Sequence, residues 1–255
     1  MSTSVKLTAL DGCSFEDPSL YRSVVGSLQY LAFTRPDISY AVNCVCQYMH
    51  SPRLPHWQAV KRILRYLHHT KSLGLHFTSS SQHTLSAFYD ADWVGCPDDR
   101  RSISGFCVYF GSHLISWGSK KQPTIARSST EAEYKSVANA TCEILWLQSL
   151  LKELGIFQKN PPTPWCDNLG ATYLSVNPVL HSITKHVDLD YHFVREWVDA
   201  KTLQVSFISS NDQIADILTK PLSAVRFQQL RSSLTITSVP LDSWEGIKGY
   251  TTSCS

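Results

Sequence analysis

The spacing of hydrophobic and polar residues changes along the chain and divides it into two zones. From about residue 17 to 72 the apolar residues recur at steps of three and four, which predicts helices. Asp17-Pro18 is typical of a helix start, because Asp accepts free backbone N–H groups and Pro fits the first turn. Two more helices are expected, after Arg35-Pro36 and after Pro55. The last one gathers its apolar residues on one face: Trp57, Val60, Ile63, Leu64 and Leu67.

Beyond a polar run at 78–82, the pattern changes to alternation, which is typical of strands. Strands are expected over 85–90, 103–110, 113–117, 164–166 and 203–208. Helices are expected over about 129–154, 171–174, 189–198 and 212–219. At the start of the first of them, Ser128-x-x-Glu131 and Thr130-x-x-Glu133 both fit a capping box, and Gly155 suits its end. This order of elements predicts a mixed α/β domain.

Charge is distributed unevenly, although its sum is small. The chain of 255 residues has a net charge of +2, which by itself does not indicate nucleic-acid binding. Between Asp37 and Asp90, however, there is no acidic residue, and that stretch holds six histidines and five basic residues: Arg53, Lys61, Arg62, Arg65 and Lys71. A region of one sign suits a polyanion such as nucleic acid, and the alternative is a solvated helix face.

Cysteine usage and hydropathy bear on the compartment. The eight cysteines are scattered and form no CxxC pair, which fits neither a disulfide framework nor a zinc site. Reduced thiols in an intracellular protein are therefore expected. No apolar run approaches the roughly 20 residues of a membrane span, so no membrane partner is expected. The first six residues lack the apolar region of a secretory signal.

One carboxylate stands out on the long helix. Its apolar residues form a stripe with helical spacing, and one further step back along that stripe lands on Glu133. A carboxylate at the head of a buried stripe is costly unless something pairs with it. Glu131 lies about 200° round the helix from Glu133 and is expected in water. The alternative is that Glu133 only caps the helix.

Three aspartates are further candidates for a buried site. Asp90 ends an otherwise apolar strand, where Asp is disfavoured. Asp167 follows a strand end, where α/β sheets bind ligands, although it could be a plain helix cap. Asp216 lies among Ile214, Ala215, Ile217 and Leu218 and could equally face solvent. Inward carboxylates are tolerable around Mg²⁺ or Mn²⁺, so metal-dependent phosphoryl chemistry is plausible.

Several longer strings, in a fixed order, carry a family resemblance. They are Tyr89–Gly95, Asp99–Gly105, Ile115–Gln122, Ser128–Tyr134, Trp165–Asn168, Lys185–Asp188, Tyr191–Glu196 and Ala215–Pro221. Together they resemble the RNase H domain of copia-type retrotransposon Pol polyproteins over residues 84 to about 222. Tyr21–Leu31, Thr34–Ile38 and Arg65–Leu67 resemble the end of the reverse transcriptase of the same polyprotein.

The resemblance implies a fold, a domain division and a metal site. The implied fold is an RNase H-like five-stranded mixed sheet flanked by helices and preceded by a small helical region. The implied domains are a thumb- or connection-like end of reverse transcriptase over 1–77 and an RNase H-like domain over 84–222. A disordered tail is expected over 235–255. Matching motifs make Asp90, Glu133, Asp167 and Asp216 the catalytic and Mg²⁺-binding carboxylates, with Mn²⁺ as an alternative ion and Asp92 as a rival to Asp90.

The implied function is hydrolysis of the RNA strand of RNA–DNA hybrids. The alternative is a transposon remnant or nucleic-acid-binding module that keeps the fold without turnover. Partners would be the hybrid and the polymerase domain of the parent polyprotein, in the cytoplasm (virus-like particles) or nucleus. Hybrid contacts are expected at the following residues: Arg100, Lys120, Lys121, Gln122, Arg127, Ser129, Thr130, Asn168, Lys61, Arg62 and Arg65.

The chain also departs from the family pattern. The Tyr-x-Asp-Asp motif of the polymerase does not occur, so no DNA synthesis is expected. Some RNases H carry a mobile His in the loop before the last Asp, but this loop, 209–213, has none. His186 or His192 could substitute, although a structural or capping role is favoured for each.

Overall fold

A mixed α/β fold is built around one five-stranded sheet in the computed structural model, which describes residues 6–79, 82–176 and 188–238. The strand order is β4-β3-β2-β5-β6. The strands are β2 (Leu85–Asp92), β3 (Ile103–Phe110), β4 (His113–Lys121), β5 (Thr163–Cys166) and β6 (Ser206–Phe207). Antiparallel pairing joins β2, β3 and β4, whereas β5 runs parallel to both β2 and β6. This is the five-stranded mixed sheet that was predicted.

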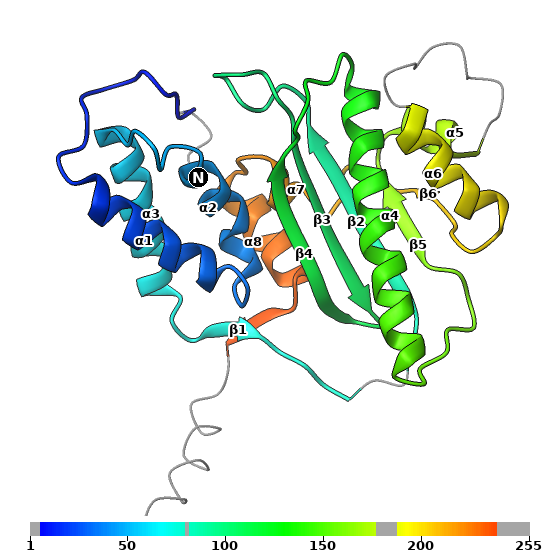
Figure 1. The fold of residues 1–255 in the computed structure, drawn as a ribbon. Helices are drawn as coiled ribbons and strands as arrows, with labels where there is room; N and C mark the ends of the chain where they lie inside the picture. The colour runs from blue at the N-terminus through cyan, green and yellow to red at the C-terminus, as the bar shows by residue number, and fades with distance from the viewer. Residues whose placement is uncertain (1–5, 80–81, 177–187, 239–255) are drawn as a thin grey trace, which may run out of the picture.

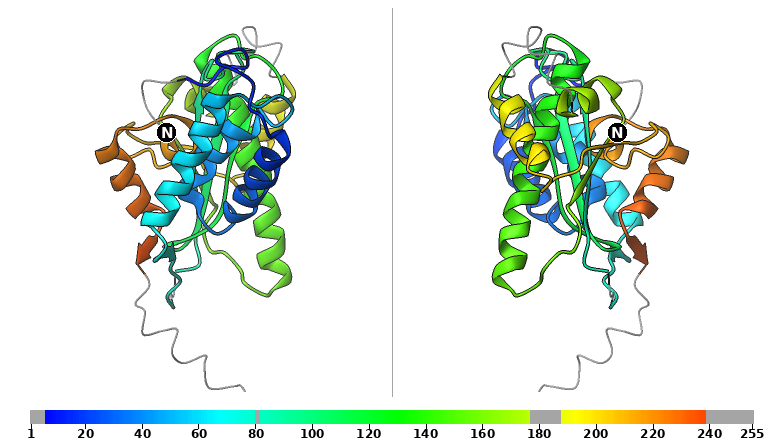
Figure 2. Two further views of the ribbon diagram at one scale, coloured as in Figure 1. Left: turned by 90° about the vertical axis from the view of Figure 1, so that its left-hand side faces the viewer. Right: turned by 90° about the vertical axis from the view of Figure 1, so that its right-hand side faces the viewer.

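Helices cover both faces of this sheet. The long α4 (Ser129–Glu153) crosses one face, with α5 (Leu169–Val176) and α6 (Asp188–Asp199) beside it (Figure 1). The buried stripe of α4 packs on β2, where Val137, Ala140 and Ile144 are fully buried against Ala87 and Tyr89. The short α7 (Asp216–Thr219) and α8 (Ala224–Ser233) lie on the opposite side of the sheet from α4 (Figure 2).

The N-terminal zone folds into helices with a core of their own. They are α1 (Pro18–Leu31), the short 3-10 turn η1 (Pro36–Ile38), α2 (Ser39–Cys46) and α3 (Leu54–His69). The predicted start of α1 is confirmed, since the Asp17 side chain accepts a hydrogen bond from the backbone N–H of Leu20. Leu64 was expected on the buried face of α3, but it is 40% exposed. None of the helices in the described ranges is long and apolar enough to cross a membrane.

The helical zone is attached to the sheet zone by specific contacts. The indole of Trp117 on β4 donates a hydrogen bond to the backbone oxygen of Ala32, at 3.0 Å. In addition, β1 (Leu73–Leu75) pairs antiparallel with β7 (Ile236–Ser238), near the end of the described chain. A disordered tail was expected from residue 235, but this expectation is wrong for residues 236–238, because they form a strand in which Ile236 is buried. Residues 239–255 lie outside the described residues.

Three elements differ in length from the prediction. The last strand of the sheet, β6, has only two residues, and α7 begins at Asp216 rather than at 212. In contrast, β4 continues to Lys121, beyond the expected end at 117. The helix α8 and the strand β7 were not predicted, since the last element expected was the helix over 212–219. The other elements of the sheet zone lie within a few residues of their predicted positions.

Candidate active site

Asp90 lies on the central strand β2 and is almost completely buried, with 1% of its surface exposed. Its register partner on β3 is Gly105. A Cβ atom on Gly105 would come within 2.7 Å of Thr219 and 2.8 Å of Leu218, so only glycine lets α7 pack this closely on the sheet. The close packing brings the Thr219 hydroxyl into a short hydrogen bond with Asp90 Oδ2. A small residue on β3 thus positions α7 against the strand carboxylate.

Glu133 reaches the same place from α4. Its side chain is buried, and its Oε1 accepts a hydrogen bond from the backbone N–H of Ala91, at 3.2 Å. Its other oxygen, Oε2, is buried and has no hydrogen-bond partner among the residues described. The carboxylate is therefore held beside Asp90 with one oxygen unsatisfied.

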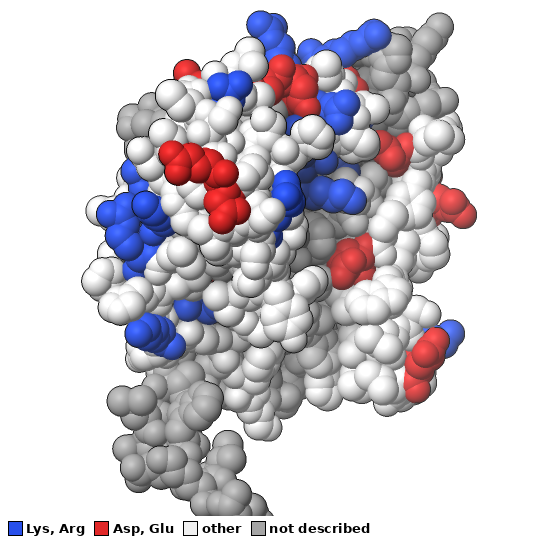
Figure 3. Space-filling view, turned by 60° about the vertical axis from the view of Figure 1, so that its left-hand side comes forward, with Lys and Arg blue, Asp and Glu red and all other residues white. Residues whose placement is uncertain are grey.

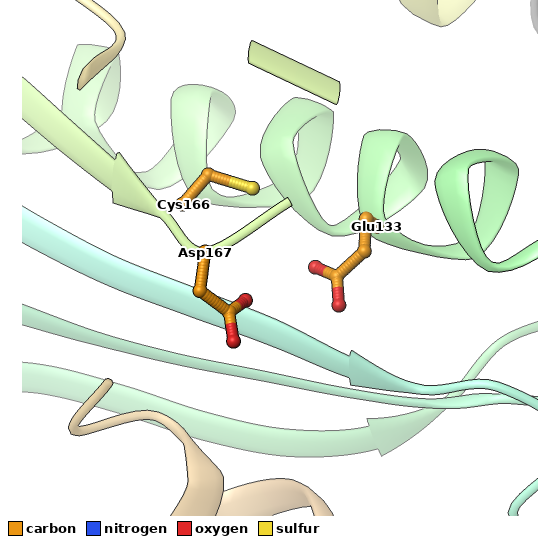
Figure 4. Close-up of side chains that lie close together, drawn as sticks. All are labelled: Glu133, Cys166 and Asp167. Atoms are coloured by element: carbon orange, nitrogen blue, oxygen red, sulfur yellow. The ribbon is translucent and has the colours of Figure 1, made fainter. Parts of the chain in front are cut away.

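Asp167 approaches from the end of β5 and is half-buried. Ligand atoms of Glu133, Asp167 and Cys166 all lie within 4.8 Å of one another. Figure 4 shows the carboxylates of Glu133 and Asp167 turned toward the same space, with the Cys166 sulfur on the side of α4. This carboxylate pair comes from two elements far apart in sequence.

Asp216, at the start of α7, completes the group through Lys220. The Lys220 ammonium lies 2.9 Å from Asp216 Oδ1 and 3.4 Å from both carboxylate oxygens of Asp90. Arg226 on α8 lies further off, 3.7 Å from Asp216 Oδ2. The four predicted carboxylates therefore come together, and a lysine that the sequence reasoning did not single out lies between two of them. Its position four residues after Asp216 was the available signal.

Burial and mutual repulsion shift the pKa values in this group. Burial, together with the charges of Asp216 and Asp167, raises the pKa of Asp90 to about 6, against the opposing effects of Lys220 and Thr219. Burial and then the charges of Asp90 and Asp167 raise the pKa of Glu133 well above its ordinary value. Burial alone would lower the pKa of Lys220, but the nearby carboxylates raise it. The positive charge near Asp90 and Glu133 thus does not offset the cost of ionising these two buried carboxyl groups.

The donor set suits a hard divalent cation. Four carboxylates offer oxygen ligands, which Mg²⁺ and Mn²⁺ prefer, and the unsatisfied Oε2 of Glu133 is a ready donor. Cys166 fits this role poorly, because burial raises its thiol pKa to about 12 and a soft sulfur is a weak ligand for Mg²⁺. Its sulfur instead accepts a hydrogen bond from the backbone N–H of Asn168, at 3.3 Å.

Asp92 lies on the same strand as Asp90 but has different surroundings. Its charge contributes, after burial, to the raised pKa values of Tyr40 and Cys44 on α2. A Cβ atom on Gly95 would come within 2.4 Å of its Oδ2, so the carboxylate lies over the turn that follows β2. Asp92 therefore faces α2 and this turn, although Lys220 is near enough to oppose the effect of burial on its pKa.

Several expected hybrid contacts are engaged inside the protein. Gln122 follows β4 and is 2% exposed, and its amide donates to the Ser104 hydroxyl on β3 and to the Ala132 carbonyl on α4. The expected substrate contact is therefore corrected to a structural link between β3 and α4. Lys121 forms an ion pair with Asp99 at 2.8 Å. Asn168 accepts a hydrogen bond from the backbone N–H of Ala171 at the start of α5.

Glu131 also differs from the expectation, since it is buried rather than in water. Its carboxylate accepts hydrogen bonds from the backbone N–H of Arg127 and from Lys135, both at 2.8 Å. The Ser128 hydroxyl accepts from the Glu131 N–H, at 3.1 Å, as a capping residue should. Glu131 is thus committed to the start of α4, and Glu133 is left to the site.

The remaining expected contacts are accessible. Arg100, Lys120, Arg127 and Ser129 are exposed, and Thr130 is half-buried. All three basic residues of α3 are exposed: Lys61, Arg62 and Arg65. Figure 3 shows the Lys and Arg side chains on one side of the molecule in several separate groups, with Asp and Glu side chains among them. Arg62 and Lys220 line one cavity of about 380 Å³, whereas Lys61 and Arg65 line a different one, and neither lining includes the four carboxylates.

The two histidines considered as substitutes for a mobile His remain untested. His186 lies outside the described residues. His192 is exposed on α6 and its ring lies 5.6 Å from that of Tyr191, centroid to centroid.

Comparisons with known proteins place the chain in a family. It is 54% identical to the retrovirus-related Pol polyprotein from transposon RE2 of Arabidopsis thaliana, over 94% of this chain and 16% of that protein. It is 43% identical to the Pol polyprotein from transposon TNT 1-94 of Nicotiana tabacum, over 82% of this chain and 16% of that protein. No protein-family model matches.

Among solved structures, the chain is similar to LC11-RNase H1 in complex with an RNA/DNA hybrid. That alignment has 11% identity and a TM-score of 0.40, over 53% of this chain and 94% of the other. The chain spans about a sixth of the length of the curated relatives it matches, since each alignment covers 16% of the relative. High identity over nearly the whole chain nevertheless decides its membership: it belongs to the retrovirus-related Pol polyproteins of copia-type transposons.

Proposed function

We propose that this chain is a ribonuclease H that uses Mg²⁺ to hydrolyse the RNA strand of RNA–DNA hybrids. The observation that carries the proposal is the convergence of four carboxylates from four separate elements: Asp90, Glu133, Asp167 and Asp216. A stable fold gains nothing from several buried like charges, so a cation is the physical reason to keep them together. Membership in the Pol polyproteins supports the same reading.

In this proposal the four carboxylates hold Mg²⁺, or alternatively Mn²⁺. Such ions, once bound, activate water for attack on a phosphodiester and stabilise the leaving oxygen. Glu133 is positioned for this by the Ala91 N–H, which leaves its Oε2 available as a ligand. Asp90 is positioned by Thr219 on one oxygen and lies on the central strand between the other contributors. Asp167 is the most accessible of the four and thus faces the incoming substrate.

Accessible residues next to the carboxylates support a hybrid as the substrate. Ser129 and Thr130 begin α4, two turns or less from Glu133, and their hydroxyls suit the 2′-OH groups that distinguish RNA from DNA. Thr130 also lies close to α5, since a Cβ atom added to Gly170 would come within 3.1 Å of the Thr130 Oγ1. The exposed Arg100, Lys120 and Arg127 suit phosphate contacts.

The helical zone has a supporting role in this proposal. It represents the end of the reverse transcriptase, and its basic α3 holds the hybrid beside the site. The polymerase domain of the longer Pol polyprotein is the proposed protein partner, in the cytoplasm, within virus-like particles, or in the nucleus. The supporting observation is that Arg62 lines the same cavity as Lys220, which in turn contacts Asp90 and Asp216.

A panel of duplexes of one sequence tests the substrate. The purified chain is incubated with Mg²⁺ and an RNA–DNA hybrid labelled on either strand, with double-stranded RNA and with double-stranded DNA. We expect cleavage of the RNA strand of the hybrid alone. Binding of the hybrid without cleavage at any Mg²⁺ or Mn²⁺ concentration would instead support the alternative, a nucleic-acid-binding module without turnover.

A further inference from the structure

Lys220 occupies the space between two of the four carboxylates. Its ammonium lies 2.9 Å from Asp216 and 3.4 Å from each oxygen of Asp90. The Lys220 side chain is 35% exposed, whereas those of Asp90 and Asp216 are 2% and 13% exposed. The lysine therefore reaches inward from the surface and places its charge over the buried pair.

The backbone at this point gives the lysine its position. Lys220 ends α7 with an extended backbone, and Pro221 follows, so the chain turns away from the sheet there. Its own N–H still donates to the carbonyl oxygen of Asp216, at 3.2 Å. The neighbouring Thr219 donates its hydroxyl to Asp90. Two consecutive residues thus supply Asp90 with a hydroxyl and an ammonium.

Within residues 6–79, 82–176 and 188–238, no ion pair joins a cation to Glu133 or Asp167, the other half of the site. Glu133 Oε2 lacks a hydrogen-bond partner within the described ranges, and Asp167 lies beside it. Among the residues that the structure describes, the half formed by Asp90 and Asp216 is thus paired with an ammonium, whereas the half formed by Glu133 and Asp167 is not.

A divalent ion and Lys220 need the same oxygen atoms. Mg²⁺ binds carboxylate oxygen at about 2.0–2.1 Å, so an ion held by Asp90 and Asp216 would compete with Lys220 for the oxygens that the ammonium now contacts. Two cations this close repel strongly. The lysine side chain is flexible and partly exposed, so it can rotate toward solvent.

Resting on the proposed function, we infer that Lys220 is a tethered counter-ion that pairs Asp90 with Asp216 and is displaced when a divalent ion bridges them. It is a positioning residue, since it acts through the two carboxylates. In the metal-free protein it relieves their repulsion, and it thereby lowers the affinity of this half of the site for metal. Displaced toward solvent, the ammonium remains at the mouth of the site, where a phosphate of the substrate would arrive.

The test compares Lys220→Met with Lys220→Arg, in the full chain and without nucleic acid. Calorimetric titration with Mg²⁺ or Mn²⁺ alone gives the affinity, and thermal melting in chelator gives the metal-free stability. Lys220→Met should melt at a lower temperature in chelator yet bind the metal roughly tenfold more tightly. Lys220→Arg keeps the charge, and a guanidinium can bind a carboxylate through two N–H groups. Because this ion pair should be harder to displace, the variant should bind the metal more weakly than the natural chain.

Lys135→Met is the matched control. Lys135 also pairs with a carboxylate four residues away, Glu131, at 2.8 Å, but it does not contact the four site carboxylates. Its loss should lower the melting temperature equally with and without metal and leave the metal affinity unchanged.

The outcomes separate this inference from the proposed function. Equal or weaker metal binding by Lys220→Met would contradict the inference that the metal displaces Lys220, but it would leave the proposed metal site in place. Failure of the natural chain to bind either ion overturns both. Should Lys220→Met not fold, Lys220→Arg decides alone, because equal or tighter metal binding by that variant contradicts competition.

Discussion

Glu133 and Ala91 are joined by a hydrogen bond from the backbone N–H of Ala91 to Oε1 of Glu133, at 3.2 Å. This contact ties α4 to β2 one residue beyond Asp90, so the helix and the central strand hold their carboxylates side by side. Glu131, in contrast, does not take part in this contact, because its carboxylate accepts hydrogen bonds from the backbone N–H of Arg127 and from the Lys135 ammonium.

Exchange of these two glutamates for glutamine should therefore have opposite effects. Glu133→Gln removes a charge that is repelled by Asp90 and Asp167, so the metal-free protein should melt a few degrees higher while cleavage is lost. Glu131→Gln removes an ion pair and weakens the start of α4, so it should lower the melting temperature and keep most of the activity. Melting in chelator and cleavage with Mg²⁺ are the two measurements, and loss of cleavage in Glu131→Gln alone would reverse the assignment.

The basic face of α3 should contribute to binding and not to chemistry. Lys61→Ala/Arg62→Ala/Arg65→Ala should lower the slope of log affinity against log salt by roughly 2–3 units, because three phosphate contacts no longer release counterions. Cleavage at saturating hybrid should persist. Binding across a salt series measures this.

Three exposed lysines elsewhere provide a control of equal charge: Lys152, Lys159 and Lys201. Lys152 lies near the end of α4, far along that helix from Glu133. Their replacement by alanine should leave the slope nearly unchanged. If both triple variants have the natural slope, the α3 face is only a solvated surface.

His56 should make the helical zone sensitive to acid. It is completely buried, its Nδ1 accepts from the Arg53 N–H, and its Nε2 contacts the Thr8 carbonyl. Burial, then the charge of Arg53, lowers its pKa despite the opposing effects of Thr8 and Asp98. A histidine with a lowered pKa contributes full stability above its ordinary value of about 6.5 and loses it as the pH falls through the lowered value.

Melting temperatures between pH 7.5 and 5 measure this contribution. The natural chain should lose more of its melting temperature than His56→Leu as the pH falls over that range, because only the natural chain must charge a buried imidazole. The variant will start from a lower melting temperature, since two backbone groups lose their partner. Parallel curves for the two proteins would show that His56 does not titrate in this range.

Local patterns were sufficient to predict much of the fold, but they only nominated the carboxylates, and the family resemblance selected the set of four. The helical period of α4 extends to Glu133 and needs no tertiary information, and the end of a strand pointed to Asp167. Asp90 was expected at a strand end, but β2 continues to Asp92. For Asp216 the pattern left two orientations open, and only the packing of α7 on Gly105 decides between them.

The features that sequence could not predict depend on contacts between distant segments. In the sequence, Gln122 resembles a polar surface residue. Only the fold brings the Ser104 hydroxyl and the Ala132 carbonyl to its amide, which lets the side chain be buried. The strand at Ile236–Ser238 exists because it pairs with Leu73–Leu75, from the other zone. The place of Lys220 between two aspartates likewise requires α7 to lie against β2 and β3.

The most direct test of the account is cleavage of an RNA–DNA hybrid, labelled on the RNA strand, by the purified chain and by Asp90→Asn and Asp92→Asn. With Mg²⁺ the natural chain should cut the RNA, and chelator should abolish the cut. Asp90→Asn should reduce the rate by roughly a hundredfold or more, since it removes a shared ligand, whereas Asp92→Asn, which faces α2, should only weaken it. Cleavage that persists in chelator, or an inactive Asp92→Asn beside an active Asp90→Asn, would contradict the proposed site.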